Sequence, residues 1–377
     1  ETGARTRRAG QNDLGSFVDE GLHVNPHLFG IDGSTDISGA GTTYSVAKHL
    51  TTNNVDLLPL AIVGAVGDLQ DSATCRLRGL NHSLVEKGVS EGMLRATRDI
   101  RIFGRETRPV ARMLQYSTDP MLPGLTNNED ACNSFLLELG IDLKEEEKWR
   151  CWVDLSTEER RTICSALAEL LLDNRLGPSS VRRLIGDVYT LEKERPGTEL
   201  HDAKEYSTLL NACGRYMKAE IGLDICRGDR GDSYSAGKTL LANHRGNLAE
   251  AISLVRDLGV HRRQHLQWFH GRDDILDSIV GIVAGMVLGS GEVVADVPII
   301  AFAYSEDEKV KVSARGTRAM VDSGLDLAYA IKKASEKVGG TGGGHNIAAG
   351  ATIGMGKEEE FLDAIEAIIQ AQMSPSG

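Results

Sequence analysis

The C-terminal part of the chain carries a β-hairpin signal that limits what it can fold into. Residues 297–305 (VPIIAFAYS) and 310–315 (VKVSAR) are rich in β-branched and apolar residues, and the charged turn 306–309 separates them. Apolar residues at helical spacing follow over roughly 324–338 and again over 361–369. Strands that alternate with helices in this way predict an α/β domain.

The N-terminal third contains a long apolar stretch that ends at an aspartate. Residues 57–66 (LLPLAIVGAV) form a nearly continuous apolar stretch, which predicts a buried helix or strand. Small residues at 38–43 precede a predicted helix, and residues 1–20 are polar and predict a loop. Asp68 follows the end of the apolar stretch, and active sites of α/β folds lie at such ends. Asp68 is therefore a candidate functional residue.

Between these parts, residues 120–200 change in character. Ser156 and Glu159 form a capping box, and Ile163 and Leu167 follow at helical spacing. The pattern predicts a small helical insertion.

Charge and composition exclude several classes of protein. The 42 Lys and Arg residues against 54 Asp and Glu residues give a net charge of −12, which argues against a protein that coats nucleic acid by bulk charge. A local basic groove is still compatible with this balance. No apolar run reaches the roughly 18 residues that a membrane helix needs, and the first residues contain no apolar region of a secretory signal, so we expect a cytoplasmic protein without a membrane partner. The six cysteines contain no Cys-x-x-Cys pair, which disfavours a zinc site or a disulfide framework.

A glycine cluster near the C-terminus is the strongest local motif. Gly342, Gly343 and Gly344 precede His345, and consecutive glycines let a loop turn its N–H groups toward a phosphate. His345 could donate a hydrogen bond to the same group. The structural alternative is a flexible glycine hinge beside a core histidine.

Two polar residues on the second hairpin strand suggest the same chemistry. Ser313 and Arg315 lie two residues apart, so a strand presents them on one face. A hydroxyl and a guanidinium on one face can hold a phosphate. An exposed strand face would show the same residue types.

A series of arginines lies between the N-terminal part and the insertion. They are spaced three or four residues apart, as on one face of a helix. The functional interpretation is a nucleic-acid track, and the alternative is pairing with the acidic surplus. The members are Arg95, Arg98, Arg101, Arg105, Arg108 and Arg112. The proposed track consists of Arg98, Arg101, Arg105 and Arg108.

Six short motifs occur in order along the chain. They are 23–30 (HVNPHLFG), 37–41 (ISGAG), 61–68 (AIVGAVGD), 103–109 (FGRETRP), 209–215 (LLNACGR) and 342–350 (GGGHNIAAG). Together they resemble the DHH/DHHA1 phosphoesterase family, specifically the archaeal RecJ-like single-strand exonucleases of the GINS-associated type. The resemblance implies two α/β domains, DHH and DHHA1, that face each other across a cleft. We accordingly predict the C-terminal part of a DHH domain over 1–118, a helical insertion over 119–183 and a DHHA1 domain over 184–377.

The resemblance also implies a two-ion centre of Mn²⁺ or Mg²⁺. Asp68 matches one ligand of that centre and is therefore the predicted catalytic and metal-binding residue. The Asp-x-Asp and Asp-His-His motifs that supply most other ligands do not occur in the sequence. Because the sequence begins with Glu1, we expect these motifs to lie upstream or to have been lost. In the DHHA1 part, the substrate-binding positions implied by the resemblance are Ser313, Arg315, Gly342, Gly343, Gly344 and His345.

The resulting functional hypothesis is a metal-dependent exonuclease for single-stranded DNA or RNA in replication or repair, with a nucleoid location. One alternative is an inactive replisome scaffold associated with GINS and the replicative helicase. Another is a phosphodiesterase for short oligonucleotides or cyclic dinucleotides.

Overall fold

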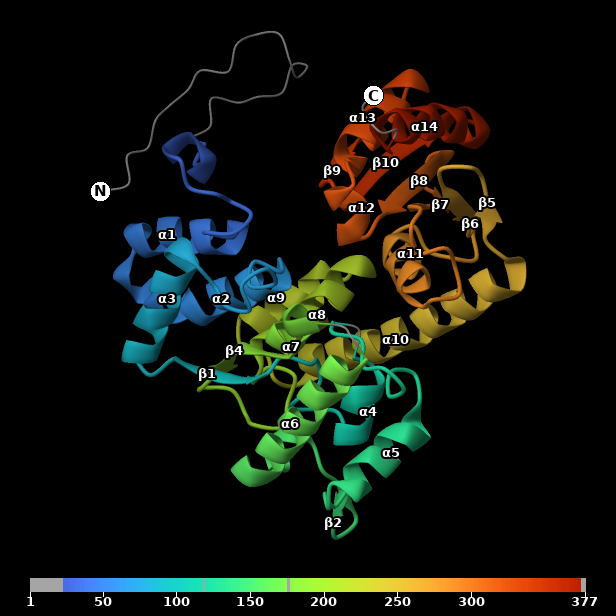
Figure 1. The fold of residues 1–377 in the computed structure, drawn as a ribbon. Helices are drawn as coiled ribbons and strands as arrows, with labels where there is room; N and C mark the ends of the chain where they lie inside the picture. The colour runs from blue at the N-terminus through green and yellow to red at the C-terminus, as the bar shows by residue number, and fades with distance from the viewer. Residues whose placement is uncertain (1–22, 118, 175–176, 374–377) are drawn as a thin grey trace. The chain divides into compact units, whose positions relative to one another are not determined.

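The computed structural model describes residues 23–117, 119–174 and 177–373 (Figure 1). The chain divides into two compact units, residues 1–211 and 212–377, and each is described by itself. Both contain helices and sheet, as the sequence predicts. The predicted polar loop over residues 1–20 lies outside the described residues. No helix among the described residues is long and apolar enough to cross a membrane.

The first unit begins with helices around a buried apolar segment. The apolar stretch 57–66 is mainly helix α2 (Leu58–Gly67), and most of its side chains are buried. Ser38 caps helix α1 (Gly39–Leu50) by accepting the Gly41 N–H at 3.0 Å, which confirms the predicted helix start. The other elements of this part are η1 (Pro26–Phe29), η2 (Thr52–Leu57), α3 (Gly79–Ser90), β1 (Leu94–Ile100) and β4 (Ile185–Leu191). Strands β1 and β4 pair antiparallel.

The predicted insertion is helical, and its apolar core is shared with Ile100, Ile102 and helix α4 (Val110–Gln115), which precede residue 119. The capping box forms as expected, because Ser156 accepts the Glu159 N–H and Glu159 accepts the Ser156 N–H. Fully buried Ile163 and Leu167 pack in this core with Trp152. The elements are α4 (Val110–Gln115), α5 (Glu129–Glu138), β2 (Lys144–Glu145), β3 (Lys148–Trp149), η3 (Trp152–Asp154), α6 (Thr157–Asp173) and α7 (Gly177–Leu184).

The second unit is built on a six-stranded sheet. Its strand order is β5-β6-β7-β8-β10-β9, and every neighbouring pair is antiparallel except β6 and β7. The strands are β5 (His261–Arg262), β6 (Gln267–His270), β7 (Ile299–Ser305), β8 (Lys309–Arg315), β9 (Thr341–Gly344) and β10 (Ala348–Gly354). The helices are α9 (Ala219–Cys226), α10 (Asp232–Leu258), α11 (Val280–Gly289), α12 (Arg318–Asp322), α13 (Leu327–Lys337) and α14 (Glu358–Met373), and α8 (Ala203–Arg215) spans the boundary between the units.

The β7–β8 hairpin forms as the sequence predicts. Its turn places Asp307 and Glu308 at φ angles of 59° and 54°. Two successive positive φ values are typical of the tight turns that match strand twist.

Helices cover both faces of this sheet (Figure 1). On one face, Phe302 of β7 packs edge-to-face on Phe361 of α14 with ring centroids 6.1 Å apart, and α13 lies on the same face against Gly342. On the other face, α11 brings Gly281 against Ser313 and Arg315 of β8. Strand β8 thus has an apolar side toward α13 and α14, and it places Ser313 and Arg315 on the side toward the start of α11.

Candidate functional site

Asp68 lies at the C-terminal end of α2, where the sequence places it, and its side chain is exposed. The Gln70 amide donates to Asp68 Oδ2 at 2.9 Å and to the Gly33 carbonyl at 2.9 Å. Buried Asn81 in turn donates to Gln70 Oε1 at 2.6 Å. One carboxylate oxygen of Asp68 is therefore held by a buried amide, and the other accepts no hydrogen bond from the described residues.

The surroundings of Asp68 do not complete a metal centre. The nearest acidic residue in sequence, Asp71, is buried and pairs with Arg101 at 2.6 Å. Within the described ranges, no group of three or more His, Cys, Asp or Glu side chains could hold a metal ion. A divalent ion needs several converging oxygen or imidazole ligands. The described residues therefore do not fit a two-ion centre, and Asp68 is a single candidate ligand.

Ser313 and Arg315 converge on the start of α11. A Cβ added to Gly281 would lie 2.5 Å from Arg315 Nη2 and 2.9 Å from Ser313 Oγ, so both side chains lie over the backbone of this glycine. Ser313 is buried and Arg315 is half-buried. Within the arginine's own strand, Arg315 Nη1 donates to the Ala314 carbonyl at 2.8 Å.

A second arginine, which the sequence analysis did not single out, joins this pair. Arg215 ends α8 and donates to the Ser278 carbonyl at 2.6 Å, two residues before α11 begins. Arg215 is the last residue of the motif 209–215, one of the six motifs on which the family resemblance rests. The resemblance assigned no role to this arginine, although its place in the motif could have pointed to it. We name Arg215, Ser313, Arg315 and Gly281 the arginine site.

The arginine site has an excess of positive charge. Burial lowers the pKa of Arg315, and the positive charge of Arg215 lowers it further. Burial also lowers the pKa of Arg215. Neither guanidinium forms an ion pair with a carboxylate in the part of the chain that the structure describes. Buried cations are normally paired, so this arrangement favours an anionic ligand.

The glycine cluster is an edge strand and not the predicted loop. Gly342, Gly343 and Gly344 form most of β9, which pairs with β10. A Cβ on Gly342 would lie within 2.9 Å of Ala351, Ser335 and Ile331, so this glycine allows α13 to approach the sheet. Nothing lies within 4 Å of a Cβ placed on Gly343. His345 is exposed beside the strand, which excludes the alternative of a core histidine.

Two alanine substitutions separate these glycine roles. We expect Gly342→Ala to lower the free energy of unfolding by about 1–3 kcal/mol, because the added methyl overpacks the contact with α13. Gly343→Ala should change it by less than about 0.5 kcal/mol. Urea denaturation of both variants checks this, and equal effects would contradict the packing role of Gly342.

The predicted helical arginine track is wrong. Arg98 belongs to strand β1, and Arg101 and Arg105 lie in the segment that follows it. Both of these latter arginines are buried, so they cannot contact a nucleic acid. Arg108 stacks on the rings of Phe103 and Tyr116, 4.6 and 5.1 Å from the centroids. The alternative of intramolecular pairing is correct for Arg101 and Arg105.

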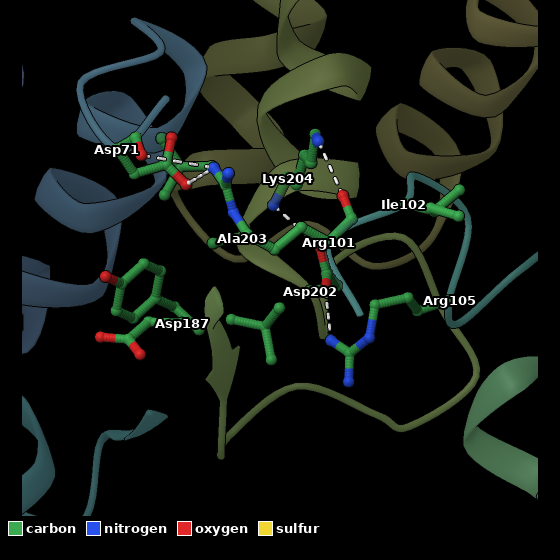
Figure 2. Close-up of a pocket in the computed structure, with 11 residues that line it drawn as sticks. Asp71, Arg101, Ile102, Arg105, Asp187, Asp202, Ala203 and Lys204 are labelled. Atoms are coloured by element: carbon green, nitrogen blue, oxygen red, sulfur yellow. Dashed lines mark hydrogen bonds and ion pairs between the residues drawn. The ribbon is translucent and has the colours of Figure 1, made fainter. Parts of the chain in front are cut away.

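Figure 2 shows the buried cluster that contains these two arginines. Arg105 donates to Asp202 at 2.9 Å and to Asp99 at 2.7 Å, and Arg101 pairs with Asp71. Lys204 donates to the Arg101 carbonyl at 2.9 Å. The space between these side chains is about 20 Å³, which accommodates about one water molecule. The cluster is therefore a structural ion network and not a substrate pocket.

A buried carboxyl extends this network. Glu205 accepts the Glu106 N–H at 2.8 Å and the Thr107 hydroxyl, and it is fully buried. Burial raises the pKa of Glu205 to about 7, and the charges of Asp202 and Glu106 contribute to the rise. Glu106 in turn lies 2.7 Å from His201 Nδ1. The motif 103–109 (FGRETRP), which precedes the insertion, thus contacts the start of α8 through Glu106 and Thr107.

Comparison with known proteins identifies the class. The DHH-CID domain model matches residues 102–185, and the DHHA1 domain model matches residues 267–371. The uncharacterized protein MJ0831 of Methanocaldococcus jannaschii is 30% identical over 359 residues, which covers 95% of this chain and 73% of that protein. The chain therefore belongs to the RecJ-like DHH/DHHA1 family, whose members are phosphoesterases.

One solved structure shows a similar fold. CDC45 from Entamoeba histolytica superimposes with a TM-score of 0.56 at 10% identity, over 88% of this chain and 72% of that chain. The exonuclease RecJ bound to manganese gives a TM-score of 0.46 at 16% identity, over 95% of this chain and 67% of that chain.

Proposed function

We propose that the chain binds a phosphate of single-stranded nucleic acid at the arginine site. The observation that carries this proposal is the pair of half-buried arginines, Arg215 and Arg315, that no described carboxylate neutralises. A guanidinium binds phosphate oxygens in a bidentate fork, and the Ser313 hydroxyl can donate to a further oxygen. The start of helix α11 favours negative charge at the same place.

The neighbouring strands support a ligand that extends beyond one phosphate. The register aligns Ser313 of β8 with Gly350 of β10 and Gly343 of β9. Gly343 is open to solvent, and exposed His345 follows the end of β9. A chain of nucleotides leaving the arginine site therefore has a flat, glycine-lined surface beside it. This agrees with substrate-binding roles for Gly342, Gly343, Gly344 and His345, with Gly342 acting through packing.

We further propose that the natural protein hydrolyses the bound strand as a Mn²⁺- or Mg²⁺-dependent exonuclease in replication or repair. Asp68 is the one position that we assign to a metal ion. The remaining ligands would have to lie outside the described residues, so no catalytic step is derived. In this proposal residues 1–118 belong to the DHH domain, 119–183 form the insertion and 184–377 form the DHHA1 domain.

A second candidate function is a non-catalytic replisome component, with GINS and the replicative helicase as candidate partners. The fold likeness to CDC45 favours it.

A cleavage assay separates the candidates. The natural gene product that contains this sequence is incubated with Mn²⁺ and with single-stranded DNA or RNA labelled at either end. We expect EDTA-sensitive release of mononucleotides from one end, and a loss of at least about 10- to 100-fold in rate for Asp68→Asn. Full activity of the Asp68 variant would contradict the ligand assignment. Strand binding without cleavage would favour the non-catalytic function, and cleavage of dinucleotides alone would favour a short-substrate phosphodiesterase.

A further inference from the structure

A second concave surface lies in the same unit as the arginine site. It is formed by the C-terminal half of α10, the end of α11 and the segment 290–294, and it encloses about 550 Å³. That volume is within the range of binding pockets in proteins. We name it the valine groove after its aliphatic lining, which consists of Ile252, Val255, Val260, Val287, Val293 and Val294.

Polar contacts link the walls of the valine groove to one another. Buried Gln267 donates to the carbonyls of Val294 at 2.7 Å and Val297 at 3.0 Å, which fixes the segment beside α11. Arg256 of α10 pairs with Glu292 at 2.7 Å and ties the same segment to α10. The buried Gln267 contacts therefore hold the segment beside β6, and the exposed Arg256–Glu292 pair adds a weaker link to α10.

The charge at the rim is positive. Arg256 and Glu292 neutralise each other, and Glu292 is the only acidic residue that lines the groove. Arg262 is exposed on the edge strand β5 and forms no ion pair with a described carboxylate. The groove therefore offers aliphatic surface next to one unpaired guanidinium.

This combination favours a peptide over a nucleic acid. Among the described residues, no aromatic side chain lines the groove, whereas proteins that bind single strands generally stack bases on aromatic rings. Strand β5 is the end of the six-stranded sheet, and within the described part of the chain it pairs only with β6. Its free edge can accept an extended backbone, as in strand addition.

We propose that the valine groove binds an extended peptide of a partner protein that carries aliphatic side chains and a carboxylate facing Arg262. This inference does not depend on the proposed function. Gly281 at the arginine site and Val287 in the groove lie six residues apart on α11, which corresponds to about 9 Å along the helix. The peptide therefore docks at the opposite end of α11 from the phosphate.

The test uses methyl NMR spectra of the full chain with defined probes. The probe peptide Ac-Glu-Val-Ile-Val-Glu-Leu is compared with its lysine counterpart, Ac-Lys-Val-Ile-Val-Lys-Leu, and with decanoate. We expect the acidic peptide alone to shift the methyl signals of Ile252, Val260 and Val293. We expect Arg262→Glu to weaken that binding at least fivefold and Val293→Lys to abolish it. Lys332→Glu is the control, because it makes the same charge change on α13, which covers the other face of the sheet.

Three results would overturn the proposal. The first is the absence of groove shifts, or equal shifts with acidic and basic peptides. The second is shifts with decanoate but not with peptide, which would indicate an acyl-chain ligand. The third is a doubled mass in light scattering together with groove shifts in the absence of peptide, which would indicate self-association. Unchanged thermal unfolding of the two groove variants shows that they remain folded.

Discussion

Replacing Arg105 with methionine is expected to lower the free energy of unfolding by about 3–5 kcal/mol. Arg105 is 6% exposed and donates to Asp202 and Asp99, whose side chains are 6% and 14% exposed. Burial alone would lower the pKa of Arg105, but the two carboxylates raise it above its usual range. Methionine fills a similar volume but leaves buried Asp202 without its ion pair and leaves Asp99 with only the more distant Arg160, 3.7 Å away.

The control for this prediction is Arg98→Met on β1. Arg98 is exposed, and we expect its replacement to change the free energy of unfolding by less than about 0.5 kcal/mol. Urea denaturation followed by circular dichroism measures both variants. Similar small effects for the two arginines would mean that Arg105 is not held in the ion network.

Replacing Glu205 with glutamine is expected to change how stability depends on pH. The pKa of Glu205 is about 7 in the folded chain, against an ordinary 4.5. A raised carboxyl pKa means that protonation favours the folded state. The wild type therefore loses stability from this group as pH rises from about 4.5 to 7, by about 3 kcal/mol in total. Glutamine cannot ionise and can keep both contacts, so the variant lacks this loss.

The measurement is the free energy of unfolding of both proteins at pH 5 and pH 8. The stability of Glu205→Gln relative to wild type should increase by about 2.5 kcal/mol between these two values, because about 0.8 kcal/mol of the change lies below pH 5. The exposed residue Glu138 on α5 gives the control, since Glu138→Gln should show no such change. A stability difference between Glu205→Gln and wild type that is the same at both pH values would refute the assignment of a raised pKa.

Local sequence signals predicted the elements that depend on local physics. The capping box at Ser156 and Glu159 gave the start of α6, and the alternation around Ser313 and Arg315 placed both on one face of β8. The apolar stretch before Asp68 could have been a helix or a strand, and the structure shows a helix. Each of these features depends on residues within a few positions of one another.

Structural roles that depend on residues far apart in the sequence could not be predicted from local patterns. The spacing of Arg101 and Arg105 suits a helical face, but their partners Asp71 and Asp202 lie 30 and 97 residues away. Gly342 suggested a phosphate loop, whereas its role depends on the close approach of α13.

The candidate site was predicted in part. Ser313 and Arg315 were predicted from the sequence, but Arg215 was not. Arg215 lies near Arg315 because α8 packs against the residues that precede α11, and this packing cannot be read from the local sequence. The metal-binding role of Asp68 and the domain boundaries stay predictions.

Binding of an end-phosphorylated oligothymidylate in EDTA tests the central claim, that the arginine site holds a phosphate, most directly. Fluorescence anisotropy compares 5′-phosphorylated, 3′-phosphorylated and unphosphorylated strands with wild type, Arg215→Met and Arg315→Met. Each lost charge-assisted contact corresponds to about 1.5–3 kcal/mol, or at least tenfold in Kd. Arg318→Met, at a largely exposed arginine of α12, is the control.

We expect one terminal phosphate to strengthen binding by the wild type and by the Arg318 variant, without added metal. The two arginine-site variants should bind weakly and lose the preference for that phosphate. Wild-type affinity and phosphate preference in both arginine-site variants would contradict the account.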